Sequence, residues 1–336
     1  MRRVMAVVVA CAAVLTGCAG SSEHGSSASG GPGDIAEITV GPSQTLAPSV
    51  QWPEGAVFTR SQSEVLWQGE GAPLLDGQPL LLDIYVKSLD NGDVLKNTYD
   101  GLPESTILAP ELLGDSLYSL LLNARVGTRV LSVSMPGGEF EDEPAIVVVI
   151  DVLSERAVGT SLEQNPQLPR VTTLSSGEPV ITFDNVTSLP KELTISTLVQ
   201  GDGPQVLPGS YVVAQFTTVY ATDGSKDGVS WKRGDIRQTS WPPERRPFEG
   251  QVGAGKLPRA WDEGLVDQTA GSRVLLVAPE AWGYPGEGTL VYVIDILDVW
   301  NDVNGQADEV LDLPSPSAGG TLTQPSAPVS QSGGTS

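Results

Sequence analysis

The chain has 336 residues, 40% of them hydrophobic, and a formal net charge of −22. This length and apolar content suffice for two or three domains with cores of their own, whereas the negative charge repels nucleic acids and anionic lipid headgroups. His24 is the only histidine, so a Ser-His-Asp triad and any metal site built on several histidines are excluded.

The N-terminus has the pattern of an export signal. Arg2 and Arg3 form a basic start, and an apolar run over residues 4–15 follows. About a dozen apolar residues are too few for a permanent membrane helix but fit a signal peptide. The run ends in Leu-Thr-Gly-Cys at residues 15–18, which resembles the bacterial lipobox. This resemblance implies a lipoprotein signal peptide over 1–17 and a Cys18 that carries the lipid, whose two chains hold a protein to the membrane. Ordinary secretion with a chance cysteine is the alternative.

The only other cysteine, Cys11, lies within this predicted signal peptide. The mature chain would therefore contain no disulfide, no catalytic thiol and no cysteine-based metal site. We expect neither a metal nor an organic cofactor.

Composition and an internal repeat divide the remaining chain. Residues 18–47 are rich in serine, glycine and proline and are expected to form a disordered tether, and residues 301–336 a disordered tail. Between them, Val-Gly-Thr-Arg at 126–129 is matched by Ala-Gly-Ser-Arg at 270–273, and Val-Ile-Asp-Val-Leu at 149–153 by Val-Ile-Asp-Ile-Leu at 293–297. Two matches in the same order indicate a tandem duplication, with chance similarity of strand-rich segments as the alternative. We predict units over 48–155 and 199–300, joined by a linker and lead-in strand over 156–198.

Each unit reads as several strands and one short helix. In the second unit, residues 211–220 and 290–299 are rich in β-branched and aromatic residues and predict strands. Residues 258–265 predict a helix, because proline suits a first helical position and acidic residues occupy the early turns. The expected fold class is α+β, with an antiparallel sheet wrapped around one short helix in each unit.

The motifs of the second unit resemble those of the FKBP-type peptidyl-prolyl isomerases. "AWDEGL" around Trp261 is close to the family's "GWEEGL", and Tyr284 in "APEAWGYP" falls on the tyrosine of "PPxxxYG". The other matched pocket positions are Phe216, Phe248, Leu257 and Tyr292. The resemblance implies two tandem FKBP-like domains, over 48–155 and 199–300.

The resemblance also implies a role for each matched residue. Trp261 would form the floor of a proline-binding pocket, Phe216 and Phe248 its walls, and the Tyr284 hydroxyl would bind the substrate carbonyl. These four are the expected catalytic residues, and the expected substrate-binding residues are Leu257, Pro258, Tyr292 and Arg237. Isomerisation crosses a barrier of about 18–20 kcal/mol without proton removal or bond breakage, so it needs neither histidine nor cysteine.

Several positions depart from the family pattern. Pro258 stands where a backbone N–H usually donates to the ligand, and proline has none. Arg237 begins the segment that replaces the family's "FDSS", and the loop after Tyr284 is shorter than usual. In the first unit, Leu117 and Val148 take the positions of Trp261 and Tyr292, so that unit is expected to be degenerate and inactive.

The sequence thus predicts a peptidyl-prolyl isomerase, anchored by lipid outside the cell membrane, that acts on exported proline-containing polypeptides. Neither nucleic acid nor metal is expected as a partner. One alternative is a catalytically inactive chaperone or protein-binding lipoprotein that kept the fold. Another is a solute-binding lipoprotein of a transporter, which the scarcity of helical periodicity disfavours.

Overall fold

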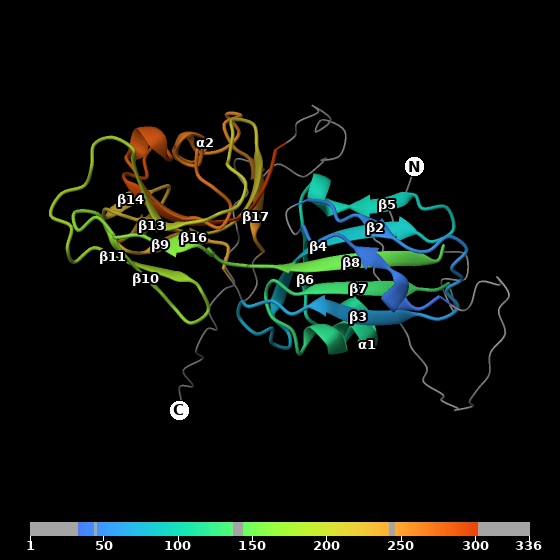
Figure 1. The fold of residues 1–336 in the computed structure, drawn as a ribbon. Helices are drawn as coiled ribbons and strands as arrows, with labels where there is room; N and C mark the ends of the chain where they lie inside the picture. Colours follow the sequence, from blue (N-terminus) through green and yellow to red (C-terminus); the bar gives the residue numbers. More distant parts are fainter. Residues whose placement is uncertain (1–32, 44–45, 137–143, 242–245, 302–336) are drawn as a thin grey trace, which may run out of the picture. The chain divides into compact units, whose positions relative to one another are not determined.

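The computed structural model describes residues 33–43, 46–136, 144–241 and 246–301 (Figure 1). The predicted signal peptide, Cys18 and the predicted tail from residue 302 lie outside the described residues. The predicted tether reaches into them. There, Ile35–Glu37 form the 3₁₀ helix η1 and Thr39–Val40 the strand β1, so ordered structure begins earlier than the boundary at residue 47. In the described part of the chain, no helix is long and apolar enough to cross a membrane.

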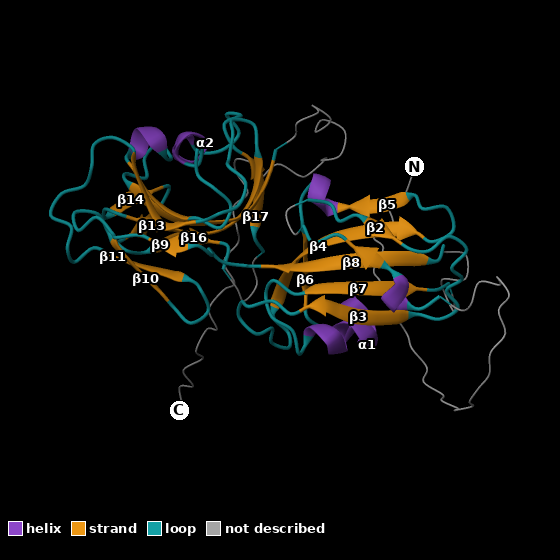
Figure 2. Ribbon diagram, viewed as in Figure 1, coloured by secondary structure: helices purple, strands orange, loops and turns teal. Residues whose placement is uncertain are grey.

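The predicted α+β class is wrong. The chain is mostly β-sheet, with 41% of residues in strands and 11% in helices (Figure 2). The helices are short, and the face of each sheet opposite its helix is covered by further strands, most of which lie in the segments predicted as the tether and as the linker and lead-in strand. This second covering layer makes the architecture mainly β.

The first sheet has six antiparallel strands in the order β3-β7-β8-β4-β5, with β6 also paired to β4. Its last strand in the sequence, β8, pairs with both β7 and β4 along nearly its whole length. The strand bounds are Gln62–Trp67 (β3), Pro79–Ser88 (β4), Val94–Asn97 (β5), Glu104–Ile107 (β6), Arg129–Ser134 (β7) and Ile146–Leu153 (β8).

One helix covers one face of this sheet. Helix α1, Pro110–Leu121, begins with a proline at its first turn and packs Leu113, Leu117 and Leu121 onto the sheet. The other face is covered by η1 and by the two-stranded sheet of β1 and β2, Val50–Gln51, with Phe58 beside them. A second 3₁₀ helix, η2, spans Thr98–Asp100.

The second sheet has seven strands. Six follow the order β16-β13-β19-β18-β12-β9, and β17 also pairs with β13. The predicted strands at 211–220 and 290–299 are confirmed as β13 and β19, and the predicted helix is α2, Arg259–Gly264. The strand bounds are Thr160–Ser161 (β9), Thr194–Gln200 (β12), Tyr211–Tyr220 (β13), Ile236–Thr239 (β16), Phe248–Gln251 (β17), Arg273–Ala278 (β18) and Leu290–Trp300 (β19).

Two hairpins and a 3₁₀ helix complete this half. Strands β10, Arg170–Thr173, and β11, Pro179–Thr182, pair with each other and lie on the sheet face opposite α2. There Leu168 and Val171 pack against Val219, Leu275 and Val293 of the sheet, among others. The second hairpin joins β14, Gly224–Lys226, to β15, Val229–Trp231, and η4 spans Glu280–Trp282.

A buried ion pair in each sheet explains the repeated motifs. Arg129 and Asp151 are partners across β7 and β8, and Arg273 and Asp295 are partners across β18 and β19. In both pairs the arginine Nε donates to a carboxylate oxygen at 2.6 Å. The glycine two residues before each arginine has a φ of +89°, which strongly favours glycine. The matched sequences therefore encode the same structural feature in both sheets, a glycine turn followed by a buried arginine–aspartate pair.

Each arginine also binds the covering layer. Arg129 donates to the Gly41 carbonyl at 2.7 Å, next to β1. Arg273 donates to the Thr173 hydroxyl at 2.6 Å and to the Gly177 carbonyl at 2.7 Å, within the β10–β11 hairpin. In both halves one guanidinium therefore links two strands of the sheet to the segment that covers it.

Candidate functional site

Four aromatic rings meet on the α2 side of the second sheet, with Trp261 in the middle. The Trp261 side chain is only 4% exposed. Its ring centroid lies 5.1 Å from Phe216, 5.2 Å from Phe248 and 6.1 Å from Tyr292, with interplanar angles of 85°, 76° and 86°. Edge-to-face packing of this kind is favourable because the positive edge of one ring meets the negative face of another. The result is a rigid aromatic floor.

The sheet register brings these rings together. On β13, Phe216 and Thr218 are two residues apart, and Thr218 is the cross-strand partner of Tyr292 on β19. On its other edge, β13 pairs Ala214 with Phe248, the first residue of β17. Side chains two residues apart on a strand share a face, so Phe216 lies on the same face as Ala214 and Thr218. It is therefore placed between Phe248 and Tyr292 of the two neighbouring strands. Trp261, in the first turn of α2, then closes the cluster.

The edge of the cluster is half-buried. Phe248, Leu257, Trp282 and Tyr284 are partly exposed and pack against the buried rings, whereas Phe216 and Tyr292 are buried. A mostly apolar surface of this kind suits a proline ring, which needs shape and apolar contact more than hydrogen bonds.

Beside the cluster lies a cation held between a ring and a carboxylate. The Arg237 guanidinium carbon is 3.9 Å from the centroid of the Tyr284 ring. Its Nη2 donates to Glu287 Oε1 at 3.2 Å, and its Nε forms a second, shorter hydrogen bond to Glu287 Oε2. Burial alone would lower the pKa of Arg237, but the hydrogen bonds and charge of Glu287 outweigh burial, and the net pKa is raised.

The chain is similar to known proteins over about a third of its length. No family model matches the chain. It is 30% identical over 121 residues to the "FK506-binding protein" of Streptomyces anulatus, and the match covers 33% of this chain and 88% of that protein. The chain belongs to the FK506-binding protein (FKBP) family.

Two further FKBP relatives give the same picture. The "Probable FK506-binding protein" of Corynebacterium glutamicum is 31% identical over 116 residues, covering 32% of this chain and 87% of its own length. The "Peptidyl-prolyl cis-trans isomerase FKBP12" of Arabidopsis thaliana is 30% identical over 112 residues, covering 30% of this chain and 90% of its own. Each relative thus matches about a third of this chain.

The structure brings most of the predicted FKBP site residues together. Trp261, Phe216 and Tyr292 are buried in one cluster, and Phe248, Leu257 and Tyr284 pack against it. Pro258 caps the start of α2, and Arg237 reaches the site through Tyr284. The roles predicted for these residues remain predictions.

The sequence reading missed three residues at this site. Glu287, Trp282 and Lys226 lie around Tyr284 or the cluster, and no family motif marked them. Lys226 donates to the Pro285 carbonyl at 2.9 Å. The Arg259 guanidinium carbon lies 3.7 Å from the centroid of the Trp282 ring. Glu287 stands three residues before β19, and nothing in the sequence around it indicates that Arg237 is its partner.

The first sheet lacks this arrangement at the matching positions. Leu117 and Val148 lie in a cluster of leucine, valine, isoleucine and alanine, with Tyr118 packed at its edge. The Tyr118 hydroxyl donates to Asp76 at 2.9 Å. The expectation that the first unit is degenerate and inactive stays a prediction.

Replacing Tyr292 with phenylalanine is expected to leave the free energy of unfolding unchanged or raise it by up to about 1 kcal/mol. Tyr292 is 2% exposed, and its hydroxyl has no hydrogen-bond partner among the described residues. Burial raises its pKa, and nearby Tyr284 adds to the effect. A buried hydroxyl without a partner is destabilising, so its loss is not harmful. Urea unfolding measures the change.

Tyr99→Phe is the matched control for this prediction. The Tyr99 hydroxyl donates to Asp151 Oδ2 at 2.8 Å, so its removal should cost about 1–3 kcal/mol. If Tyr292→Phe destabilised the protein as much as Tyr99→Phe, the Tyr292 hydroxyl would have a partner after all.

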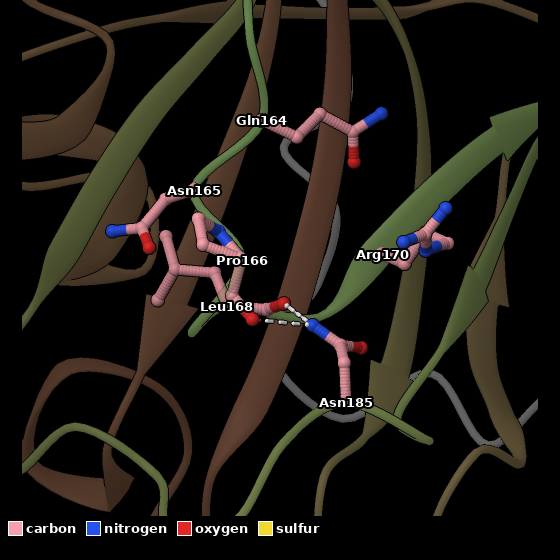
Figure 3. A pocket seen from close by; sticks show the side chains of 6 residues that line it. All are labelled: Gln164, Asn165, Pro166, Leu168, Arg170 and Asn185. Atoms are coloured by element: carbon pink, nitrogen blue, oxygen red, sulfur yellow. Dashed lines mark hydrogen bonds between the residues drawn. The ribbon is translucent and has the colours of Figure 1, made fainter.

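A separate small pocket lies by the covering hairpin (Figure 3). Its volume is about 170 Å³, and it is lined by Gln164, Asn165, Pro166, Leu168, Arg170 and Asn185. The Asn185 side-chain amide donates to the carbonyls of Pro166 at 2.9 Å and Leu168 at 2.6 Å, as Figure 3 shows. Asn185 therefore ties the segment after β11 to the segment before β10, which is a structural role, and no predicted site residue lines this pocket.

Proposed function

We propose that this FKBP-family chain is a peptidyl-prolyl cis-trans isomerase whose active site is the aromatic cluster around Trp261. The observation that carries this proposal is the meeting of three aromatic rings on the buried Trp261 indole, with half-buried Leu257 and Tyr284 beside it. The name of the Arabidopsis relative supports the same activity.

In this proposal, the site catalyses isomerisation by binding the substrate proline and by surrounding its amide with apolar groups. The substrate proline ring packs on the aromatic floor, with Phe248 and Leu257 at its sides. The Tyr284 hydroxyl donates a hydrogen bond to the substrate carbonyl. This bond holds the substrate peptide in place while the amide rotates. Surroundings of low polarity favour the twisted amide, because charge separation is smaller in the twisted amide than in the planar one. The reaction needs neither proton transfer nor a cofactor.

We further propose where this activity is used. A signal peptide over 1–17 and a lipid on Cys18 would hold the chain outside the cell membrane, so its substrates would be exported proline-containing polypeptides. For the first sheet, in which Leu117 and Val148 lie in an aliphatic cluster, we propose a structural or substrate-holding role.

Trp261→Ala is expected to abolish catalysis of isomerisation. NMR exchange spectroscopy on an Ala-Leu-Pro-Phe peptide, with the full chain added, measures the cis-trans rate. The intact protein should accelerate exchange well beyond the uncatalysed timescale of about 10–100 s. The variant should not, because it lacks the floor of the site.

Trp231→Ala is the matched control, with circular dichroism of both variants as the check on folding. Trp231 is also buried, but it stacks on Tyr220, with a centroid distance of 4.3 Å, outside the four-ring cluster. Its loss should leave most of the acceleration. Absence of acceleration by the folded intact chain would refute the isomerase proposal.

One observation favours a second candidate, a non-catalytic protein-binding module. Pro258, at the start of α2, has φ −52° and no N–H to offer a ligand. Peptide binding without acceleration, seen as NMR shifts of the Trp261 indole signal, would support this candidate.

A further inference from the structure

Arg237 occupies the wall position where the family resemblance placed a phenylalanine, but its charge is already engaged. Its guanidinium carbon lies 3.9 Å from the centroid of the Tyr284 ring, and two of its nitrogens bond to Glu287. The Arg237 side chain is 19% exposed and that of Glu287 12%. An ion pair so far removed from water is screened less than a surface pair, so this contact is a structural element of the site.

Three contacts fix the short loop that carries Tyr284. Lys226 donates to the Pro285 carbonyl at 2.9 Å, and the Gly286 N–H donates to Glu280 Oε1 at 2.6 Å. The third contact joins Arg237 to Glu287. Among these three, the Arg237 contact alone also reaches the Tyr284 ring itself. It is therefore the contact that can set the direction of the phenol as well as the path of the loop.

We propose that Arg237 is a positioning residue that, together with Glu287, orients the Tyr284 hydroxyl toward the bound substrate. A guanidinium lying on one ring face is attracted by the ring quadrupole, and its bonds to Glu287 keep it from leaving that face. The ring can then turn away only by breaking its contact with the guanidinium, which Glu287 holds in place. This inference rests on the proposed isomerase function, because that proposal assigns the hydrogen bond to the substrate carbonyl to the Tyr284 hydroxyl.

A double-mutant cycle in the full chain tests this role. Arg237→Ala should lower kcat by about three- to tenfold, the size of one lost hydrogen bond, with little change in KM. In a Tyr284→Phe background, Arg237→Ala should have almost no further effect, because the hydroxyl that it orients is gone. Arg237→Lys keeps the charge but not the planar stack, and should recover only part of the loss.

Arg233→Ala is the matched control. Arg233 also lies over an aromatic ring, Phe183, at 4.7 Å, but Phe183 packs in the apolar cluster on the opposite face of the sheet. This variant removes the same charge and the same kind of contact and should leave kcat unchanged. An equal fall in kcat for Arg237→Ala with and without the Tyr284 hydroxyl would overturn the positioning role.

A second readout needs no catalysis. The NMR resonances of the Tyr284 ring should move in Arg237→Ala and Glu287→Gln and stay in place in Arg233→Ala. If the intact chain does not accelerate isomerisation while these resonances move as expected, the proposed function fails and the positioning of Tyr284 stands. If the Tyr284 resonances do not respond to Arg237→Ala, the positioning role is refuted whatever the activity.

Discussion

Replacing Arg273 with alanine is expected to lower the free energy of unfolding by about 3–5 kcal/mol. Asp295 is 1% exposed and Arg273 5%, so the variant would leave a carboxylate buried without its cation. The variant would also lose the bonds to Thr173 and Gly177, which hold the β10–β11 hairpin on the sheet. Because whole domains are stable by only about 5–15 kcal/mol, this single change should bring the second sheet close to unfolding.

Urea unfolding followed by circular dichroism measures this loss, and Arg259→Ala is the control. Arg259 pairs with Glu263 one helical turn away, with side chains 57% and 48% exposed. Removing this surface pair together with the contact between Arg259 and the Trp282 ring should change stability by less than about 2 kcal/mol. Similar losses for both variants would mean that the buried pair contributes no more than a surface one.

A chain beginning at residue 199 is expected to aggregate or remain unfolded, whereas one beginning at residue 156 should fold. The shorter chain lacks β9, β10, β11 and all of β12 except its last two residues, so β18 loses its partner strand and Val219, Leu275, Val277, Val291 and Val293 would face water. Exposing each such side chain costs roughly 1.5–3 kcal/mol, and together they exceed the stability of an ordinary domain. The independent unit is therefore expected to include residues 156–198, which the sequence predicts as a linker and lead-in strand.

Size-exclusion chromatography and thermal unfolding of the two chains, residues 156–301 and 199–301, decide this point. The longer chain should give one cooperative transition and a monomeric peak. If the shorter chain is monomeric and melts at the same temperature, the hairpin is dispensable and the boundary at residue 199 is right.

The parts of the fold that could be predicted are those written in local patterns. β13, β19 and α2 follow from β-branched runs and from a proline followed by acidic residues. The covering hairpins were missed because β10 and β11 have only four residues each and lie among turn residues. One pattern did indicate them. Residues 274–278 and 290–294 are unbroken apolar runs in the sequence, and such runs are typical of strands covered on both faces.

The site divides in the same way. Its aromatic members could be predicted because they lie in recognisable motifs around Trp261 and Tyr284. The pairing of Arg237 with Glu287 could not, since the two residues are fifty positions apart and meet only through the register of β16 and the path of a loop. Likewise, the sequence shows that residue 292 is a tyrosine, but only the fold shows that its hydroxyl lies buried without a described partner.

The strand order has a consequence for how the chain folds. In both sheets the strand that comes last in the sequence is central, with β8 between β7 and β4 and β19 between β18 and β13. Neither sheet can close before its final residues are available, and the aspartate of each buried pair arrives with that strand. Folding must therefore wait for contacts between distant parts of the sequence, which makes it slow. Until then, the earlier strands expose apolar edges that a chaperone could bind.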